Sequence, residues 1–110
     1  AAISMGLGQA ISEELQISKG SVANGDFSSY RFLTAKDAPS NDHVSTHIVE
    51  IPQFDGPYKA KGFSEATTSP TAPAIANAIF DAVGLCLRHM PMTPERVLEG
   101  LDRLTSADRD

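Results

Sequence analysis

The sequence predicts an α+β fold in which amphipathic and buried helices pack on a small sheet. Three segments repeat apolar residues at the spacing of a helix, over 1–17, 73–88 and 94–104. Between the first two lies a stretch, 26–52, with the composition of loops and one strand. The 110 residues are enough for one domain, and no internal repeat or low-complexity tract divides them.

The helix predicted over 1–17 has one apolar side and two internal glycines. Gly6 and Gly8 lie within the helical pattern, where each costs up to about 1 kcal/mol relative to alanine. Two interpretations are open: the helix begins in a frayed or kinked turn, or another backbone or a ligand comes close to it here. The apolar positions are Ile3, Leu7, Ala10, Ile11 and Leu15.

Residues 26–52 are predicted to be extended segments joined by loops. After the turn signal Asn24-Gly25-Asp26, three aromatic residues are expected to be half-buried in an extended run, and 35–42 has loop composition. Alternating apolar and polar residues predict a strand over 44–51, which Pro52 closes. The aromatic residues are Phe27, Tyr30 and Phe32, and the alternating positions are Val44, Thr46 and Ile48.

The helix predicted over 73–88 is apolar around most of its circumference. Pro73 suits its first turn, where the missing N–H has no cost. The polar residues Asn77, Asp81 and Arg88 fall within a narrow stripe. A helix of this kind is typical of the core of a larger protein. We therefore expect a partner or further polypeptide to cover it.

Charge and cysteine content argue against several classes of protein. Nine basic and 14 acidic residues give a net charge of −5, so neither nucleic acid nor an anionic membrane surface is an expected partner. No apolar run approaches the roughly 20 residues of a membrane span. A single cysteine and no visible secretory leader favour a cytoplasmic location. No metal ligands are expected, because His43 and His47 in a strand would lie about 13 Å apart.

One acidic residue lies in a context that suits catalysis. Glu65 follows Lys61-Gly62-Phe63-Ser64 and precedes Ala66-Thr67-Thr68, so small residues would let a bulky ligand approach the backbone. A carboxylate that becomes desolvated at such a place is a useful general base. By residue type alone, any one of the 14 acidic residues is more often a solvated surface charge.

Five stretches of the chain occur in a distinctive order. They are Gly6-Leu7-Gly8-Gln9-Ala10 with Glu13-Glu14-Leu15; Tyr30-Arg31 with Thr34-Ala35 and Asp37-Ala38-Pro39; Gly56-Pro57-Tyr58 with Ala60-Lys61-Gly62-Phe63-Ser64-Glu65-Ala66; Pro73-Ala74-Ile75-Ala76-Asn77-Ala78-Ile79; and Pro91 with Thr93-Pro94-Glu95. Together they resemble the C-terminal end of the large, molybdopterin-binding subunit of the molybdenum hydroxylases, the xanthine dehydrogenase and aldehyde oxidase family. The resemblance implies that 1–110 is a fragment of a larger molybdopterin-binding domain, with 56–69 as the loop on the cofactor side.

The resemblance implies an oxidoreductase that oxidises an aldehyde or an N-heterocycle, a small-molecule substrate, by hydroxide transfer from molybdenum held by molybdopterin. Glu65 matches the family's general base, which takes a proton from the metal-bound hydroxide. Gly62, Phe63 and Ser64 match the loop beside the metal and the pterin. The resemblance also implies iron–sulfur centres and FAD on other domains or subunits, and the remainder of the molybdopterin-binding subunit as a partner.

Three residues depart from the family pattern. Ser64 stands where glycine is usual, Met5 where many relatives have glutamine, and Lys59 where glycine is common. These departures fit an outlying branch or an altered substrate. Because the family's pocket needs polypeptide that these 110 residues lack, the chain is expected to be inactive in isolation. The alternative is a non-enzymatic interaction module, or a degenerate relative, that docks its apolar helix on a partner.

Overall fold

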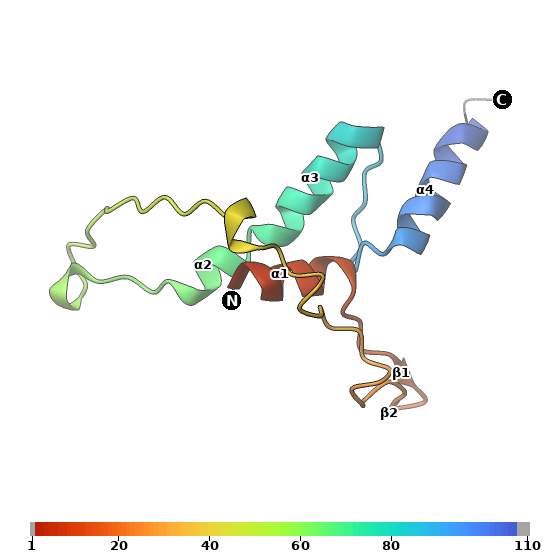
Figure 1. Ribbon diagram of the computed structural model, residues 1–110, viewed down its shortest axis with the longest axis horizontal. Helices are drawn as coiled ribbons and strands as arrows, with labels where there is room; N and C mark the ends of the chain where they lie inside the picture. The colour runs from red at the N-terminus through yellow and green to blue at the C-terminus, as the bar shows by residue number, and fades with distance from the viewer. Residues whose placement is uncertain (1, 108–110) are drawn as a thin grey trace.

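The computed structural model describes residues 2–107 and confirms the α+β class. Four α-helices and one two-stranded antiparallel hairpin make up the described part, together with two short 3₁₀ helices. Figure 1 shows α3 and α4 rising on the same side of α1, while residues 44–63 reach out to the left as a long arm. The β1–β2 hairpin projects to the lower right, away from the arm and from α3 and α4. The elements are α1 (Ala2–Ile11), β1 (Ile17–Ser18), β2 (Ser21–Val22), α2 (Ser64–Thr68), α3 (Thr71–Val83) and α4 (Pro94–Ala107), with 3₁₀ helices over Asn41–His43 and Pro57–Lys59.

Helix α1 ends at Ile11 and not at residue 17, so the prediction for 12–17 is wrong. The buried side chain of Asn24 holds this stretch in a non-helical path: its Oδ1 accepts a hydrogen bond from the Gln16 N–H at 2.8 Å. Its Nδ2 donates to the Glu14 carbonyl at 2.7 Å. The chain then forms the β1–β2 hairpin, whose two turn residues, Lys19 and Gly20, have the positive φ values that favoured hairpin turns require.

The prediction of an extended run after Asp26 is also wrong. The Asp26 carboxylate accepts the backbone N–H groups of Ser28 and Ser29, and the Asp26 carbonyl accepts the Tyr30 N–H at 2.9 Å, so the chain turns here. Phe27 is 91% exposed and not half-buried; its ring meets that of Phe32 edge-on at 5.9 Å.

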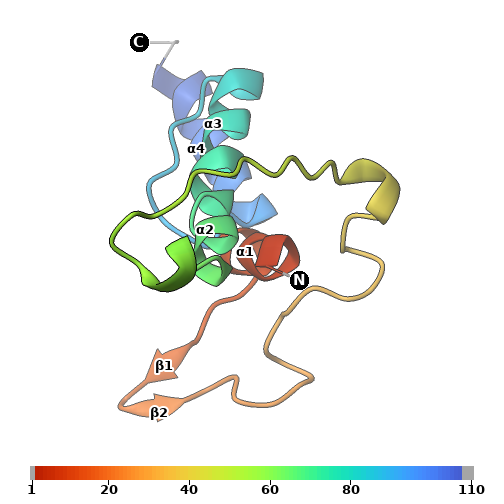
Figure 2. The same cartoon turned by 90° about the vertical axis from the view of Figure 1, so that its left-hand side faces the viewer.

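Residues 44–51 are extended but form no strand among the described residues, so the predicted strand is not found there. A strand needs a hydrogen-bonded neighbour. No backbone hydrogen bond joins 45–52 to another described residue. Figure 2 shows this stretch running from the 3₁₀ helix at Asn41–His43 without a strand on either side.

Helix α3 begins at Thr71, two residues before the predicted start at 73, and ends at Val83, five residues before the predicted end at 88. Gly84 adopts a left-handed conformation (φ 73°) and its N–H caps the Phe80 carbonyl, which is a common helix stop. Helix α4 continues to Ala107, beyond the predicted end at 104. The longest described helices have 13 and 14 residues, and none of the described helices is long and apolar enough to cross a membrane.

The chain buries little of its own apolar surface. Only Ala10, Leu85 and Met92 are buried hydrophobic residues among those described. The accessible surface is 9170 Å², whereas a compact protein of this mass has about 6,000 Å². The radius of gyration is 18.1 Å, against about 13 Å for a compact domain of this length. The small core joins α1 to the segment before α4, where the Met92 N–H donates to the Ala10 carbonyl at 2.6 Å.

Candidate functional site

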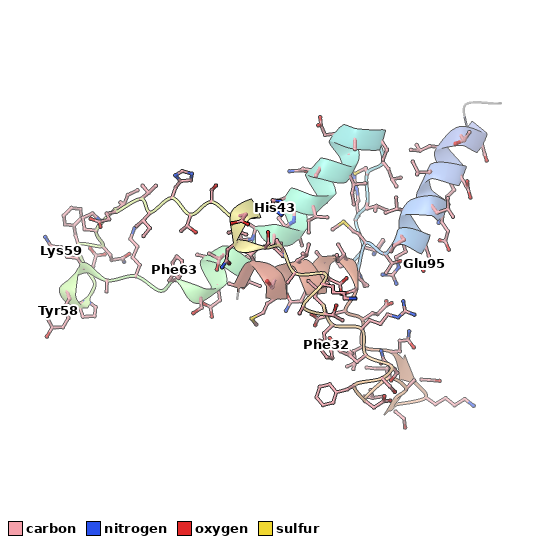
Figure 3. The ribbon with its side chains drawn as sticks, viewed as in Figure 1. Phe32, His43, Tyr58, Lys59, Phe63 and Glu95 are labelled. Atoms are coloured by element: carbon pink, nitrogen blue, oxygen red, sulfur yellow. The ribbon has the colours of Figure 1, made fainter. Side chains whose placement is uncertain are left out.

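The predicted catalytic residue lies on the short helix α2 at the base of the arm. Glu65 is in the first turn, directly after Ser64, and both side chains are exposed. Among the described residues, no hydrogen bond or ion pair engages the Glu65 carboxylate. Phe63 precedes the helix and is 73% exposed, and Figure 3 shows it where the arm meets α2. The structure therefore presents Glu65 with Gly62, Phe63 and Ser64 on one uncovered stretch.

A tight turn at the tip of the arm leads into this stretch. The Gln53 N–H donates to the Lys59 carbonyl at 3.2 Å, and the Lys59 ammonium lies 5.9 Å from the centre of the Phe54 ring. Tyr58 and Lys59 both have positive φ, of 53° and 61°. Glycine adopts this conformation without strain, so the backbone at Lys59 is one that favours glycine. Figure 3 shows Tyr58 and Lys59 pointing outward from the tip.

Close packing against α1 sets the position of α2. A Cβ on Gly6 would lie 2.7 Å from the Thr71 side chain and 2.9 Å from the Thr68 carbonyl oxygen. Hydroxyl groups tie the α2–α3 junction together: Thr67 donates to the Ser64 carbonyl at 3.1 Å, and Thr71 donates to the Thr67 carbonyl at 3.0 Å. Of the two interpretations of the glycines in α1, the close approach of another backbone is the one found at Gly6.

Residues 62–65 are exposed, and they do not line the best-formed grooves of the described surface. One of them, an apolar groove next to α2, lies between α1 and α3 and is lined by Ile3, Leu7, Pro70, Thr71, Ala74, Ile75 and Ala78. A cavity around Glu65 requires additional polypeptide.

The ionisable groups with shifted pKa values lie at turns and helix starts. Hydrogen bonds from Ser28 and Ser29 lower the pKa of Asp26 to about 2. Hydrogen bonds from Thr34 lower the pKa of Asp37. These groups stabilise local structure and lie apart from residues 62–65 in the chain.

No metal cluster is found in the part of the chain that the structure describes. It holds no group of three or more histidine, cysteine or acidic side chains that could bind an ion. His43 lies in a 3₁₀ helix and its Nδ1 is 3.2 Å from the Ser40 hydroxyl.

Ionic and polar contacts that the sequence did not indicate hold α4 to the segment after α1. The Arg96 guanidinium donates to the Glu14 carboxylate at 2.6 Å and to the Pro91 carbonyl at 2.8 Å. The Tyr30 hydroxyl donates to the Glu13 carboxylate at 3.0 Å, which raises the pKa of Tyr30. The partners in the first pair are 82 positions apart, so no local pattern could have revealed it.

Comparison with known proteins gives several relatives, although no family model matches the chain. The chain is 38% identical, over 87% of its length, to the membrane-bound aldehyde dehydrogenase [pyrroloquinoline-quinone] of Gluconacetobacter polyoxogenes. It is 31% identical, over 91% of its length, to the molybdenum-binding subunit PaoC of the aldehyde oxidoreductase of Escherichia coli. It is 34% identical, over 86%, to the putative xanthine dehydrogenase molybdenum-binding subunit XdhA of the same organism.

A solved structure has the same fold. Quinoline 2-oxidoreductase from Pseudomonas putida 86 matches 92% of this chain with a TM-score of 0.78 and 22% sequence identity. The chain spans only 13% of that protein, and 11%, 14% and 12% of the three relatives just named. The sequence motifs and these comparisons agree: the chain is homologous to one segment of the molybdenum-binding subunits of aldehyde and xanthine oxidoreductases.

Proposed function

We propose that this chain is the C-terminal segment of the molybdopterin-binding subunit of a hydroxylase, and that Glu65 is its general base. The observation that carries the proposal is 31–38% identity across most of the chain to oxidoreductases, of which several are named molybdenum-binding subunits. The reaction class is oxidation of an aldehyde or an N-heterocycle. One relative is named for a different cofactor, pyrroloquinoline quinone, so the metal content is part of what must be tested.

The surface at Gly62 is open. A Cβ on Gly62 would meet no atom within 4 Å, and Gly62 has no positive φ that would call for glycine. Nothing within the described chain therefore requires glycine at this position. In the proposal, the backbone of Gly62, Phe63 and Ser64 lies against the molybdenum cofactor, which the rest of the subunit holds.

Glu65 contributes the proton transfer. When bound, the molybdenum cofactor supplies the centre that gives oxygen to the substrate and accepts its electrons. A base must lie within hydrogen-bond reach of the proton that it abstracts. The exposed carboxylate in the first turn of α2 has no competing partner among the described residues and is open to such a contact. The carboxylate oxygens accept and hold the proton while the substrate is oxidised.

The proposal includes partners outside the chain. The single cysteine, Cys86, cannot by itself ligate an iron–sulfur cluster, so the iron–sulfur centres and FAD lie on other domains or subunits. The remainder of the molybdopterin-binding subunit covers the stretch 62–65, and the 110 residues alone are inactive. A cytoplasmic location is also part of the proposal, although one relative is named a membrane-bound enzyme.

The test replaces Glu65 by Gln in the complete polypeptide. Because general-base catalysis contributes about 10²–10⁴-fold, turnover should fall at least about 100-fold while the metal content stays unchanged. Asp55→Asn is the matched control, since Asp55 is an exposed carboxylate on the same arm; its turnover should remain close to that of the unmodified protein. Near-normal turnover of Glu65→Gln with molybdenum bound would defeat the assignment.

A second candidate function is a non-enzymatic module that docks α3 on a partner. The observation in its favour is that α3 has no buried residue and that Phe80 and Val83 are exposed. Purified complete protein with no molybdenum and no turnover, but with a stable complex by light scattering, would favour this candidate. A monomer that binds no hydrophobic dye would count against it.

A further inference from the structure

The first half of the arm, residues 44–51, has the conformation of a strand without a neighbour. No turn, bend or helix interrupts the segment, Figure 1 shows it as an open, drawn-out trace, and no backbone hydrogen bond joins 45–52 to another described residue. Its first hydrogen bonds lie just outside it, where the Val44 N–H donates to the Asn41 carbonyl and the Gln53 N–H to the Lys59 carbonyl. The peptide groups in between are available for pairing.

Both faces of this segment are apolar near its centre. In an extended chain, alternate residues point to opposite faces. Ile48 is therefore on one face, and Val49 and Ile51 are on the other; their exposures are 83%, 77% and 65%. Thr46 and Glu50 share the face of Ile48, so the apolar area on that face is confined to Ile48, whereas Val49 and Ile51 are adjacent on the other face. Apolar side chains on both faces are typical of a strand in a sheet covered on both sides.

The amount of exposed surface indicates what covers the segment. The chain has about 3,000 Å² more accessible surface than a compact protein of its mass. A standard protein–protein interface covers about 800 Å² per partner, so one contact with a second copy would leave most of the excess exposed. The relatives are roughly seven to nine times as long as the region that this chain matches. A polypeptide of that length can cover the excess.

We propose that residues 44–51 form a strand in a sheet whose other strands come from the part of the same polypeptide outside these 110 residues. This inference rests on the proposed function only in taking the chain as a segment of a longer subunit. Pairing would anchor one limb of the arm. Because Gln53 and Lys59 are hydrogen-bonded across the turn, the anchored strand would also fix where the returning limb places Gly62 and Glu65.

Hydrogen exchange of the complete, purified polypeptide tests the strand directly. Amides in a sheet open rarely and exchange slowly. We expect at least two of the amides from residues 46–51 to exchange tenfold or more slowly than in an unstructured peptide of the same sequence. If fewer than two of these amides exchange tenfold or more slowly than in the peptide, the inference is overturned.

Two variants at one position test the burial of the segment. In Ile48→Asp, the amides of residues 46–51 should exchange about tenfold or more faster than in the unmodified protein, because the substitution places a carboxylate in an apolar layer. Ile48→Val keeps an apolar β-branched side chain and should retain the slow exchange. Equal protection in both variants would show that this side chain stays in water, against the inference. If Ile48→Asp does not fold, exchange of the unmodified protein still decides.

The hydrogen-exchange experiment tests the strand and the Glu65→Gln experiment tests the base, so either hypothesis can be rejected without the other. Protection of 46–51 with normal turnover of Glu65→Gln would support the strand and reject the base. Loss of turnover in Glu65→Gln without any protection of 46–51 would reject the strand and support the base.

Discussion

Replacing Gly6 by alanine tests how α1 positions the helix that carries Glu65. The added Cβ would lie 2.7 Å from Cβ and Oγ1 of Thr71 and 2.9 Å from the Thr68 carbonyl oxygen. Ordinary contacts of a Cβ begin near 3.4 Å. To reach 3.4 Å, the Thr71 side chain must move away by 0.7 Å (from 2.7 Å) and the Thr68 carbonyl oxygen by 0.5 Å (from 2.9 Å). Because Thr68 contributes a backbone atom, the separation moves the end of α2 itself.

The expected magnitude follows from two opposing terms. Overpacking a tight contact costs about 1–3 kcal/mol. Alanine in place of glycine favours a helix interior by up to about 1 kcal/mol. The net effect should be a destabilisation of α1 by about 1 kcal/mol, and at most about 2. Since small displacements of catalytic groups lower rates steeply, turnover should fall by about tenfold.

Gly100→Ala is the matched control, because it puts the same methyl group into another helix. There the Cβ would meet only side-chain atoms of Leu85, at 2.7 Å. A leucine side chain can rotate into the adjoining groove that both residues line, whereas a carbonyl oxygen cannot. Gly100→Ala should leave turnover within about twofold, since α4 does not carry the site.

The assay combines local hydrogen exchange of α1 with turnover and metal content, all measured on the complete polypeptide. The reasoning requires Gly6→Ala to weaken α1 and to lower turnover while molybdenum stays bound. If Gly6→Ala and Gly100→Ala behave alike in both measurements, the contact between α1 and the α2–α3 junction does not position Glu65.

Two further predictions concern the contacts that fix the chain. Glu14→Gln should destabilise the first turn of α4 by about 0.5–1 kcal/mol in hydrogen exchange, because the half-buried Arg96 loses a 2.6 Å ion pair. Glu99→Gln should change the stability of that turn by about 0.3 kcal/mol or less, since the 3.4 Å pair between Glu99 and Arg103 is exposed. Equal effects of the two variants would contradict this ranking. The pKa of Asp26 is lowered from 3.8 to about 2, chiefly by the Ser28 hydroxyl, so the carboxylate stabilises the folded turn above about pH 4 and this contribution is lost as the pH falls towards 2. In Ser28→Ala, an NMR titration should give a higher pKa for Asp26, and an unchanged pKa would show that the hydroxyl is not the main cause.

The sequence predicted the start of the last helix correctly, and several other helix ends wrongly. The last helix starts at Pro94 as expected, because proline suits a first helical position. Helix α3 stops at Gly84, although the apolar pattern continues to residue 88, since one left-handed glycine outweighs periodicity. Helix α1 stops early because the buried Asn24 side chain binds residues 14 and 16, and that contact is non-local.

The proposed site rests on a family resemblance and not on a physical pattern in the sequence. Glu65 is one of 14 acidic residues, and among the described residues its side chain is exposed. The only local feature in the sequence that favoured Glu65 was the set of small residues around it. The glycine at position 6 carried a clearer physical signal, because a glycine within a helix has a cost that a close backbone contact can explain.

The same physical fact explains the failed strand and the open site. Residues 44–51 have the alternation of a strand, yet pairing needs hydrogen-bond partners that the described residues do not offer. Residues 62–65 are the proposed cofactor-side stretch, yet they are exposed, and desolvation of Glu65 needs atoms that the described residues do not place there. The two stretches are the opposite limbs of one arm, joined at the Gln53–Lys59 hydrogen bond. Because the limbs are joined at this turn, polypeptide that pairs with the first limb would also restrict the position of the second.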